Sequence, residues 1–493
     1  MKRHGIDYEA LDKTHLWHPF TQMRDWMDSP QLVIERGQGV YLFDTKGNRY
    51  LDGVSSLWAN IHGHRHPVLT RAIRWQLTQL EHSTFLGLTN VPAVELGKKL
   101  VAVAPRNLTR VFYSDNGSTA VEVALKMSFQ FWRQKGKEFA RKKTFISFTN
   151  AYHGDTIGSV SLGGVDLFHQ IFKPLLFKSY KAFYPDCYRC PFGKQPTSCE
   201  VYCVKDFEAI LKKHHREVCA VVVEPAVQGA AGMLTAPRGF LKRIETLCHE
   251  HHIHLILDEV ATAFGRTGTM FACEHEQVAP DFLALAKGLS GGTLPLAATL
   301  TTRDVFEAFL GEHTDFKSFF HGHTYTGNPL ACAAAAANLD LFKSEKTLQK
   351  LKPKIAYLNG RLADFWQLQH VGDIRQAGFM VGIELVKDRD SKTPYPAKDR
   401  IGHAVVLEAR RRGVILRPLG NVIVLMPPLS ISRAQLKVLL DVTYGSIATA
   451  TKELEQAPTS RRSSTVYNGR TTASLRKKRK SSRSDIREGG HGS

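Results

Sequence analysis

The sequence lacks a long hydrophobic run. No apolar stretch approaches the roughly 20 residues needed to span a bilayer, so the sequence predicts no membrane-spanning helix. The first twenty residues, MKRHGIDYEALDKTHLWHPF, lack an apolar segment and a small-residue cleavage site, so they do not predict a secretory signal. We therefore expect a cytoplasmic protein.

Acidic residues are scarce relative to basic ones. The chain has 46 Asp and Glu against 66 Lys and Arg, which gives a net charge of +20. Eight of these charges come from residues 456–493, a stretch rich in Ser, Thr, Gly and Arg. Such a composition buries too little apolar surface to fold, so we predict a disordered basic tail. Contact with RNA or acidic partners stays open, but a charge run alone is weak evidence, and we expect no nucleic-acid partner.

Cysteine is also rare, with eight in 493 residues, but four are clustered. Cys187, Cys190, Cys199 and Cys203 form a C-x2-C-x8-C-x3-C pattern. Paired thiolates at such spacing can hold zinc or an iron–sulfur cluster, although eight intervening residues are fewer than a typical zinc ribbon supplies. The chemistry that the other candidate residues of the sequence predict needs no metal. We therefore favour free thiols in an excursion of the large domain, and the metal state of the cluster stays open.

The length and composition predict more than one folding unit. A chain of 493 residues that is 43% hydrophobic exceeds the usual size of a single core. We expect residues 1–60, with a hairpin turning at 46–48, to be the N-terminal segment of a small domain. The other expected parts are a large domain over 61–325, the C-terminal part of the small domain over 326–455, and the tail over 456–493.

Short β-rich runs alternate with helical patterns in the first two thirds of the chain. This alternation is typical of an α/β fold, with a mostly parallel sheet covered by helices on both faces. The last two runs are close together, so one of them can run antiparallel. A smaller α+β lobe is expected over 371–430, with a helix near 401–412. The six runs are 110–114, 143–148, 219–224, 254–258, 281–286 and 296–302.

Four of these runs are followed by residues that could carry chemistry. Gly117 and Ser118 open a helix, whose free N–H groups could seat a phosphate. Tyr152, Asp258 and Lys287 follow or end three further runs. Each alone is explained by packing, capping, a salt bridge or a surface lysine. Together they supply what pyridoxal phosphate (PLP) requires at the edge of a sheet: a phosphate seat, an aromatic cover, an anion and an amine.

The surrounding motifs resemble those of a known family. FYSDNGSTAVEVALKM, AYHGDT, LILDEVATAFGRTG, ALAKGLSGG, HGHTYTGNPLAC and LRPLG are similar to the subgroup III PLP-dependent aminotransferases of fold type I. The resemblance covers residues 10–445 and implies a transaminase that is a homodimer with shared active sites. HLWHPFTQM and DGVSSLWANIHGH are similar to the biotin-pathway branch, which converts 8-amino-7-oxononanoate to 7,8-diaminononanoate.

The resemblance also implies roles for individual residues. Lys287 would bond to the cofactor and move the proton, Asp258 would pair with the pyridine nitrogen, and Tyr152 would contact cofactor and substrate. Val260 would pack on the other face of the ring. The phosphate would be bound by Gly117, Ser118, Thr324 and the backbone of His323, the last two coming from the neighbouring subunit.

The substrate pocket implied by the resemblance includes a carboxylate-binding guanidinium. Arg417, in LRPLG, would bind the carboxylate of the oxononanoate, because an arginine fork suits a bidentate contact. The remaining pocket residues would be Phe20, Leu57, Trp58, Tyr152, Gly322 and Lys287.

Three of these positions depart from the pattern of members that use S-adenosylmethionine. Those members commonly carry a tyrosine at the position of Phe20, paired tryptophans at the positions of Leu57 and Trp58, and a proline at the position of His323. The segments HSTFLGLTNVPA and FFHGHTYTGNP are closer to the branch that uses lysine. The amino donor is therefore S-adenosylmethionine or lysine. Two other functions stay open: an aminotransferase of another ω-amino acid or diamine, and a nucleic-acid-binding protein on a cofactor-free relic of the fold.

Overall fold

A computed structural model describes residues 5–456. The predicted tail therefore lies outside the described residues, apart from its first residue. The described chain falls into two compact units, residues 5–31 and residues 32–456. The domain boundaries expected near residues 60 and 325 do not coincide with this division and stay a prediction. None of the helices between residues 5 and 456 combines the length and the apolar character needed to cross a membrane.

The first unit consists of two short helices, α1 (Tyr8–His15) and α2 (Met23–Asp28). Asp12 joins them, since its carboxylate accepts a hydrogen bond from the Trp26 indole at 2.7 Å and pairs with the His18 ring at 2.9 Å. Phe20 lies between the helices and is exposed.

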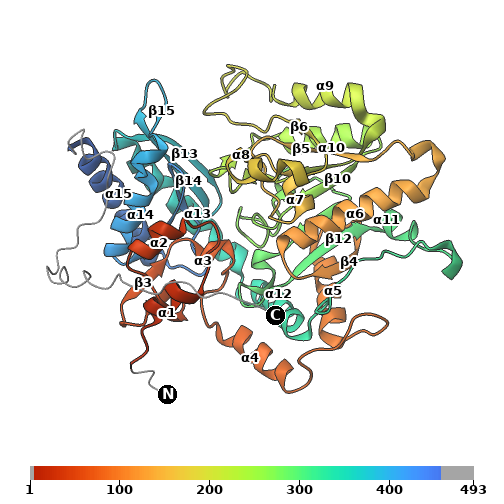
Figure 1. The fold of residues 1–493 in the computed structure, drawn as a ribbon, viewed down its shortest axis with the longest axis horizontal. Coiled ribbons are helices and arrows are strands. Elements are labelled where there is room, and N and C mark those ends of the chain that lie inside the picture. Colours follow the sequence, from red (N-terminus) through yellow and green to blue (C-terminus); the bar gives the residue numbers. More distant parts are fainter. Residues whose placement is uncertain (1–4, 457–493) are drawn as a thin grey trace, which may run out of the picture. The chain divides into compact units, whose positions relative to one another are not determined.

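A seven-stranded sheet dominates the second unit, and it confirms the predicted parallel architecture (Figure 1). Only β12 runs antiparallel, and it does so to both of its neighbours. All six predicted runs are strands of this sheet, while the seventh, β6, is short and largely polar and was not predicted. In spatial order the strands are β4 (Leu108–Ser114), β12 (Ala297–Thr302), β11 (Phe282–Leu285), β10 (His254–Asp258), β7 (Val218–Val223), β5 (Thr144–Phe148) and β6 (Tyr180–Ala182).

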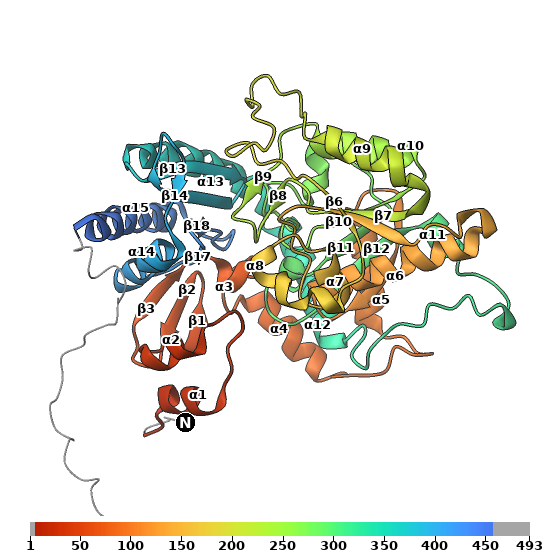
Figure 2. The same cartoon turned by 45° about the horizontal axis from the view of Figure 1, so that its top comes forward.

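Helices cover both faces of this sheet, because alternate strand residues point to opposite sides. Ile256 packs in a cluster with α6 (Gly117–Lys135), whereas Leu255 and Leu257 pack in a cluster with α10 (Phe240–Glu250). In Figure 2, α9 and α10 lie above the strands and α6 below them. The other helices around the sheet are α4 (Pro67–Leu77), α5 (Val91–Val103), α7 (Ile157–Leu162), α8 (Asp166–His169), α9 (Val204–His214), α11 (Arg303–Glu307) and α12 (Pro329–Ser344).

The remaining strands combine the beginning of this unit with its end. The predicted hairpin is present as β2 and β3, and β3 pairs in parallel with β16 near the C-terminus. A two-stranded ribbon, β8 (Val227–Gln228) and β9 (Leu234–Thr235), stands alone. One sheet has β1 (Ile34–Gln38), β2 (Tyr41–Asp44), β3 (Arg49–Asp52) and β16 (Val414–Ile415), and the other has β13 (Val371–Ala377), β14 (Met380–Asp388), β15 (Thr393–Pro394), β17 (Arg417–Leu419) and β18 (Val422–Leu425).

Three long helices pack with these smaller sheets: α13 (Thr347–Leu362), α14 (Ile401–Arg411) and α15 (Arg433–Gln456). The α14 helix matches the one expected near 401–412. A short left-handed turn, labelled α3 (Ser55–Trp58), connects the hairpin to the sheet. Its four residues have φ between 47° and 72°, a conformation that costs about 1–2 kcal/mol for each residue with a side chain.

Candidate active site

One cavity of about 800 Å³ opens at the carboxyl edge of the seven-stranded sheet. Parallel strands place the residues that follow them at one edge, which is where open α/β sheets bind ligands. Here the strands β4, β5, β10 and β11 all end at the cavity. The predicted residues that line it are Trp58, Gly117, Ser118, Tyr152, Asp258, Val260 and Lys287.

Lys287 lies two residues beyond the end of β11 and lines the cavity. Its Nζ lies 5.4 Å from the centre of the Trp58 ring. Burial lowers the pKa of this amine, while the negative charges of Asp258 and Glu224 act in the opposite direction. A buried amine with a lowered pKa is neutral in a larger fraction of molecules, which makes it a better nucleophile and proton acceptor.

Asp258 ends β10 and is held by a histidine. Its Oδ2 accepts a hydrogen bond from Nδ1 of His153 at 2.7 Å, and its Oδ1 accepts one from the backbone N–H of Val260 at 3.1 Å. Both side chains of the Asp258–His153 pair are almost fully buried. This pairing fixes the carboxylate in place and leaves it at the cavity wall, where it can meet a positively charged ring nitrogen.

The N-terminus of α6 forms an anion seat. Asn116 caps the helix by accepting a hydrogen bond from Thr119 N at 3.1 Å, so the N–H groups of Gly117 and Ser118 stay available toward the cavity. Gly117 leaves no room for a side chain, because a Cβ there would lie 2.7 Å from a methyl of Val260. The Ser118 hydroxyl accepts a hydrogen bond from Asp155 N at 3.0 Å.

Gly154 lets the segment after β5 approach α6 closely enough for the hydrogen bond between Asp155 N and the Ser118 hydroxyl. Its φ of +116° is unfavourable for residues with a side chain, and a Cβ would lie 1.8 Å from the Ser118 hydroxyl oxygen. The segment after β5 can therefore reach the α6 terminus only with glycine at this position.

Tyr152 is positioned by two carboxylates. Its hydroxyl donates to Asp155 at 2.8 Å, and its backbone N–H donates to Glu224 at 3.1 Å. Burial and the hydrogen bond to Asp155 raise the pKa of Tyr152, so its hydroxyl stays protonated. Glu224 also accepts from Gly229 N at 3.0 Å, and burial raises the pKa of its carboxyl group to about 7.

Two residues that line the cavity were missed as functional residues in the sequence. His153 follows Tyr152 directly, but nothing in the sequence shows that its ring reaches Asp258 across the sheet. Glu224 follows the buried run CAVVV, the same signal that identified Asp258. Applying that signal to every strand would have found Glu224.

The other predicted site residues do not line this cavity. Arg417 lies on β17, is partly buried and interacts electrostatically with Tyr152, and its Nε has no hydrogen-bond partner among the described residues. Leu57 is about half exposed. The segment Gly322–Thr324 lies between α11 and α12, and its His323 N–H donates to Thr326 within the same loop. Phe20 belongs to the unit of residues 5–31.

The family model for the class-III aminotransferases matches residues 23–444. The chain belongs to this family. The aminotransferase is 58% identical over 443 residues to a protein of Nitratidesulfovibrio vulgaris named adenosylmethionine-8-amino-7-oxononanoate aminotransferase, a match that covers 90% of this chain and 82% of the relative. The sequence-based expectations of an aminotransferase and of its family are thus confirmed.

Solved structures agree with the fold of this aminotransferase. The enzyme of the same name from Methanocaldococcus jannaschii is 46% identical with a TM-score of 0.85, and the match covers 90% of this chain and 98% of that one. An amine transaminase from an uncultivated Pseudomonas species, crystallised with PLP bound, is 34% identical with a TM-score of 0.84, over 88% and 98% of the two chains. The predicted fold class is confirmed.

Proposed function

We propose that this aminotransferase uses PLP to transfer an amino group to 8-amino-7-oxononanoate, which yields 7,8-diaminononanoate for biotin biosynthesis. The observation that carries the proposal is the 58% identity, over 90% of the chain, to a relative named for this acceptor. The amino donor is S-adenosylmethionine or lysine. Another ω-amino acid or diamine as substrate is the alternative that the experiment below addresses.

The cavity residues fit PLP. The phosphate would be bound at the start of α6, where Gly117 and Ser118 line the cavity and offer N–H groups. Asp258 would meet the pyridine nitrogen, and Lys287 would hold the aldehyde carbon. When bound, PLP supplies an electron sink that lets a proton leave the carbon bearing the donor's amino group.

The chain's own residues would then manage the protons. Lys287 would take the proton from the carbon and return it, a role suited to an amine whose pKa burial lowers. Asp258, oriented by His153, would keep the ring nitrogen protonated. Trp58 would cover the amine and limit the access of water, since its ring lies beside Lys287 Nζ.

Arg417 would bind the carboxylate end of the acceptor. Its guanidinium is partly buried close to Tyr152, and burial lowers its pKa while the neighbouring tyrosine acts in the opposite direction. A carboxylate arriving there would form a charge-assisted pair. Tyr152 lines the cavity and interacts electrostatically with Arg417, which suits contact with both cofactor and acceptor.

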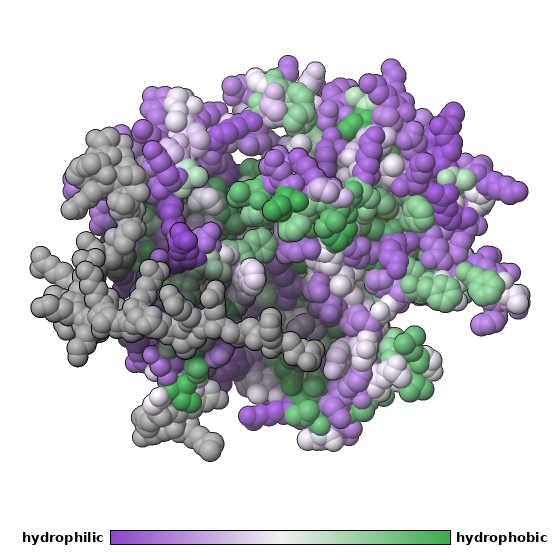
Figure 3. All heavy atoms as spheres, in the orientation of Figure 1, coloured by the Kyte–Doolittle hydropathy of each residue, from purple (hydrophilic) through white to green (hydrophobic). Residues whose placement is uncertain are grey.

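We also infer a homodimer with shared active sites. In support, Gly322–Thr324 does not line the cavity of its own chain, and the surrounding segment exposes Phe316, Phe320 and Tyr325. Figure 3 shows apolar side chains at the surface where this segment projects in Figure 1. A second subunit would cover them and supply the backbone of His323 and the hydroxyl of Thr324 to the phosphate. A cytoplasmic location is part of the proposal, because the substrates are metabolic intermediates.

The experiment that tests the function is a comparison of donors. Protein loaded with PLP is incubated with 8-amino-7-oxononanoate and either S-adenosylmethionine or lysine, and 7,8-diaminononanoate is measured by mass spectrometry. We expect product with one of the two donors and none with Lys287→Ala. Absence of product with both donors, in a protein that still exchanges amino groups with other ω-amines, would support the alternative substrate class.

A further inference from the structure

The four clustered cysteines meet at one small cavity, separate from the active-site cavity. They lie in the irregular excursion between β6 and α9 and line a space of about 20 Å³. This volume is about that of one water-sized sphere. Four thiols that are spread over 17 residues of chain thus converge on a space for a single small occupant. The four are Cys187, Cys190, Cys199 and Cys203.

The backbone around these cysteines is built from tight turns. Gly193 N donates to Cys190 O at 3.1 Å, and Tyr202 N donates to Cys199 O at 2.8 Å. Glu200 and Val201 have φ of 46° and 58°, which is left-handed backbone. Such strain in residues with side chains persists only where the surroundings fix it, and it is common at ligand clamps. One turn thus begins at Cys190, the second member of the first pair, and the other begins at Cys199, the first member of the second pair.

We propose that Cys187, Cys190, Cys199 and Cys203 bind one structural zinc ion. Four thiolates without a water position are the ligand set of structural zinc. Among residues 5–456 no three such side chains already stand around a metal position. Binding therefore requires the thiols to move closer together than the structure places them.

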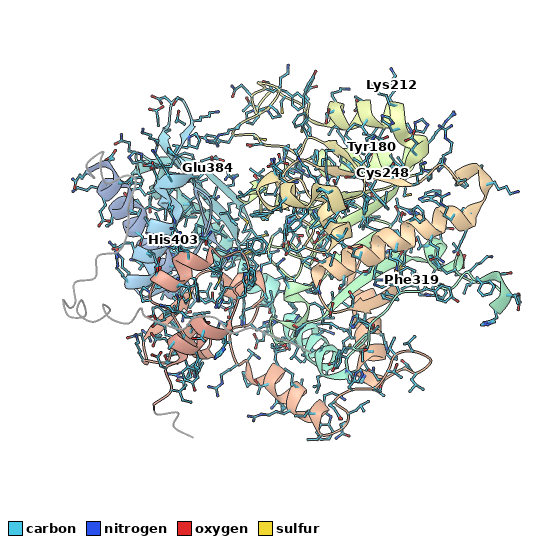
Figure 4. All side chains as sticks on the ribbon, viewed as in Figure 1. Tyr180, Lys212, Cys248, Phe319, Glu384 and His403 are labelled. Carbon is cyan, nitrogen blue, oxygen red and sulfur yellow. The ribbon has the colours of Figure 1, made fainter. Side chains whose placement is uncertain are left out.

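The zinc site would fix a contact between two parts of the fold. Arg189, between the first two cysteines, forms an ion pair with Glu384 on β14 and donates to Lys392 O at 2.8 Å. Lys392 in turn donates to Tyr188 O at 2.7 Å. Figure 4 labels Glu384 on the part of the structure that carries β14. A zinc ion would hold the two residues between Cys187 and Cys190 in place for this contact.

Further contacts link Glu384 to Trp58 at the active-site cavity. Glu384 also accepts a hydrogen bond from Arg375 at 2.6 Å, and Arg375 donates to Gly232 O at 2.9 Å. Gly232 belongs to the loop between β8 and β9, and Gly229 of the same loop packs against Trp58. Loss of the ion would loosen this connection without removing any group from the cofactor seat.

The test is a metal analysis of the full-length enzyme, purified without an affinity tag or chelator from cells grown with zinc. We expect about one zinc per chain and four thiols that become reactive only after metal release. The double variant Cys187→Ser/Cys190→Ser should lose the zinc. The matched control Cys332→Ala, a buried cysteine in the alanine-rich helix α12, should keep it.

A second variant keeps the proposal testable if the double variant fails to fold. Cys190→His converts the site to three thiolates and one imidazole, which is another common zinc set, and should retain the metal. Replacement of zinc by cobalt should give the visible absorption of tetrahedral cobalt thiolate. Zinc far below one per chain, disulfides detected by mass, or iron with sulfide would each overturn the proposal. None of these readouts depends on transaminase activity.

Discussion

At the scale of single residues, the active site consists of groups that are each held by a neighbour. Asp258 is oriented by His153, Tyr152 by Asp155, and the Ser118 hydroxyl by the chain after Gly154. Lys287 is the exception, since its amine faces the cavity and is held mainly by enclosure. The fixed groups suit binding and orientation, and the less restrained amine suits a proton carrier.

Replacing Lys287 by alanine removes the amine on which the proposed chemistry depends. We expect Lys287→Ala to lower kcat by at least about 10³-fold, since both a nucleophile and a general base are lost. Borohydride reduction followed by mass spectrometry should show covalently retained PLP in the wild type and none in the variant. Lys350→Ala, at an exposed lysine on α13, is the matched control and should behave like the wild type.

Gly154→Ala should damage the phosphate seat. The new methyl group would collide with the Ser118 hydroxyl and force either the helix start or the loop to move. We expect PLP affinity to fall by about 10-fold or more, corresponding to at least about 1.4 kcal/mol, as measured by fluorescence titration of the apoenzyme. Gly360→Ala on α13, where a Cβ meets open space, should bind PLP normally. Unchanged affinity in Gly154→Ala would show that the seat is elsewhere.

At the scale of elements, the sheet was predictable and its connections were not. Six strands were visible as apolar runs because burial on both faces demands continuous hydrophobic sequence. The edge strand β6 escaped, since its partly exposed residues are polar. The left-handed turn Ser55–Trp58 also escaped, because its conformation is imposed by distant partners: Ser55 Oγ donates to Met426 O at 2.6 Å. The local sequence around Ser55 therefore cannot predict a conformation that depends on a partner 371 residues away.

The edge strand β6 carries a lysine that should make stability depend on pH. Lys181 donates to the Ser147 hydroxyl at 2.6 Å, and burial lowers the pKa of its amine from 10.5 to about 7. The unfolded chain therefore binds one more proton than the native chain between about pH 7 and pH 10, so stability from this group rises with pH through that window.

Lys181→Met removes this titration. Relative to the variant, the wild type should gain roughly 3 kcal/mol of unfolding free energy between pH 7 and pH 10. The check is urea unfolding of both proteins at the two pH values. Lys178→Met, at an exposed lysine just before the strand, should keep the wild-type dependence. The same pH dependence in Lys181→Met and the wild type would contradict the assignment.

At the scale of the whole molecule, the chain alone does not complete the proposed site. The sequence located the groups that lie on the sheet edge, because strand ends are readable. It predicted His323 and Thr324 only through the family resemblance, and their segment does not line the cavity of its own chain. Where such a segment binds depends on a second subunit, which periodicity and spacing within one chain cannot specify.

Mixed dimers test this sharing. Lys287→Ala and Thr324→Glu should each be inactive alone, the second because a carboxylate would repel the phosphate. In a random mixture made by co-expression, half of the dimers would be mixed, and each would contain one site with both native residues. We expect roughly a quarter of the wild-type activity. Activity no higher than the average of the two single variants would place Lys287 and Thr324 in the same subunit's site.

The left-handed turn at Ser55–Trp58 also sets an order of events during synthesis. Besides Ser55 with Met426, the Arg266 guanidinium bridges Trp58 O and Asn60 O to Pro427 O. The wall beside Lys287 therefore cannot be finished until the chain near residue 427 leaves the ribosome. At about 5–20 residues per second, the turn at Ser55–Trp58 is made roughly 20–70 s before its partners Met426 and Pro427. Until that point the cofactor seat lacks its finished wall, so we expect stable cofactor loading only after the chain near residue 427 has emerged.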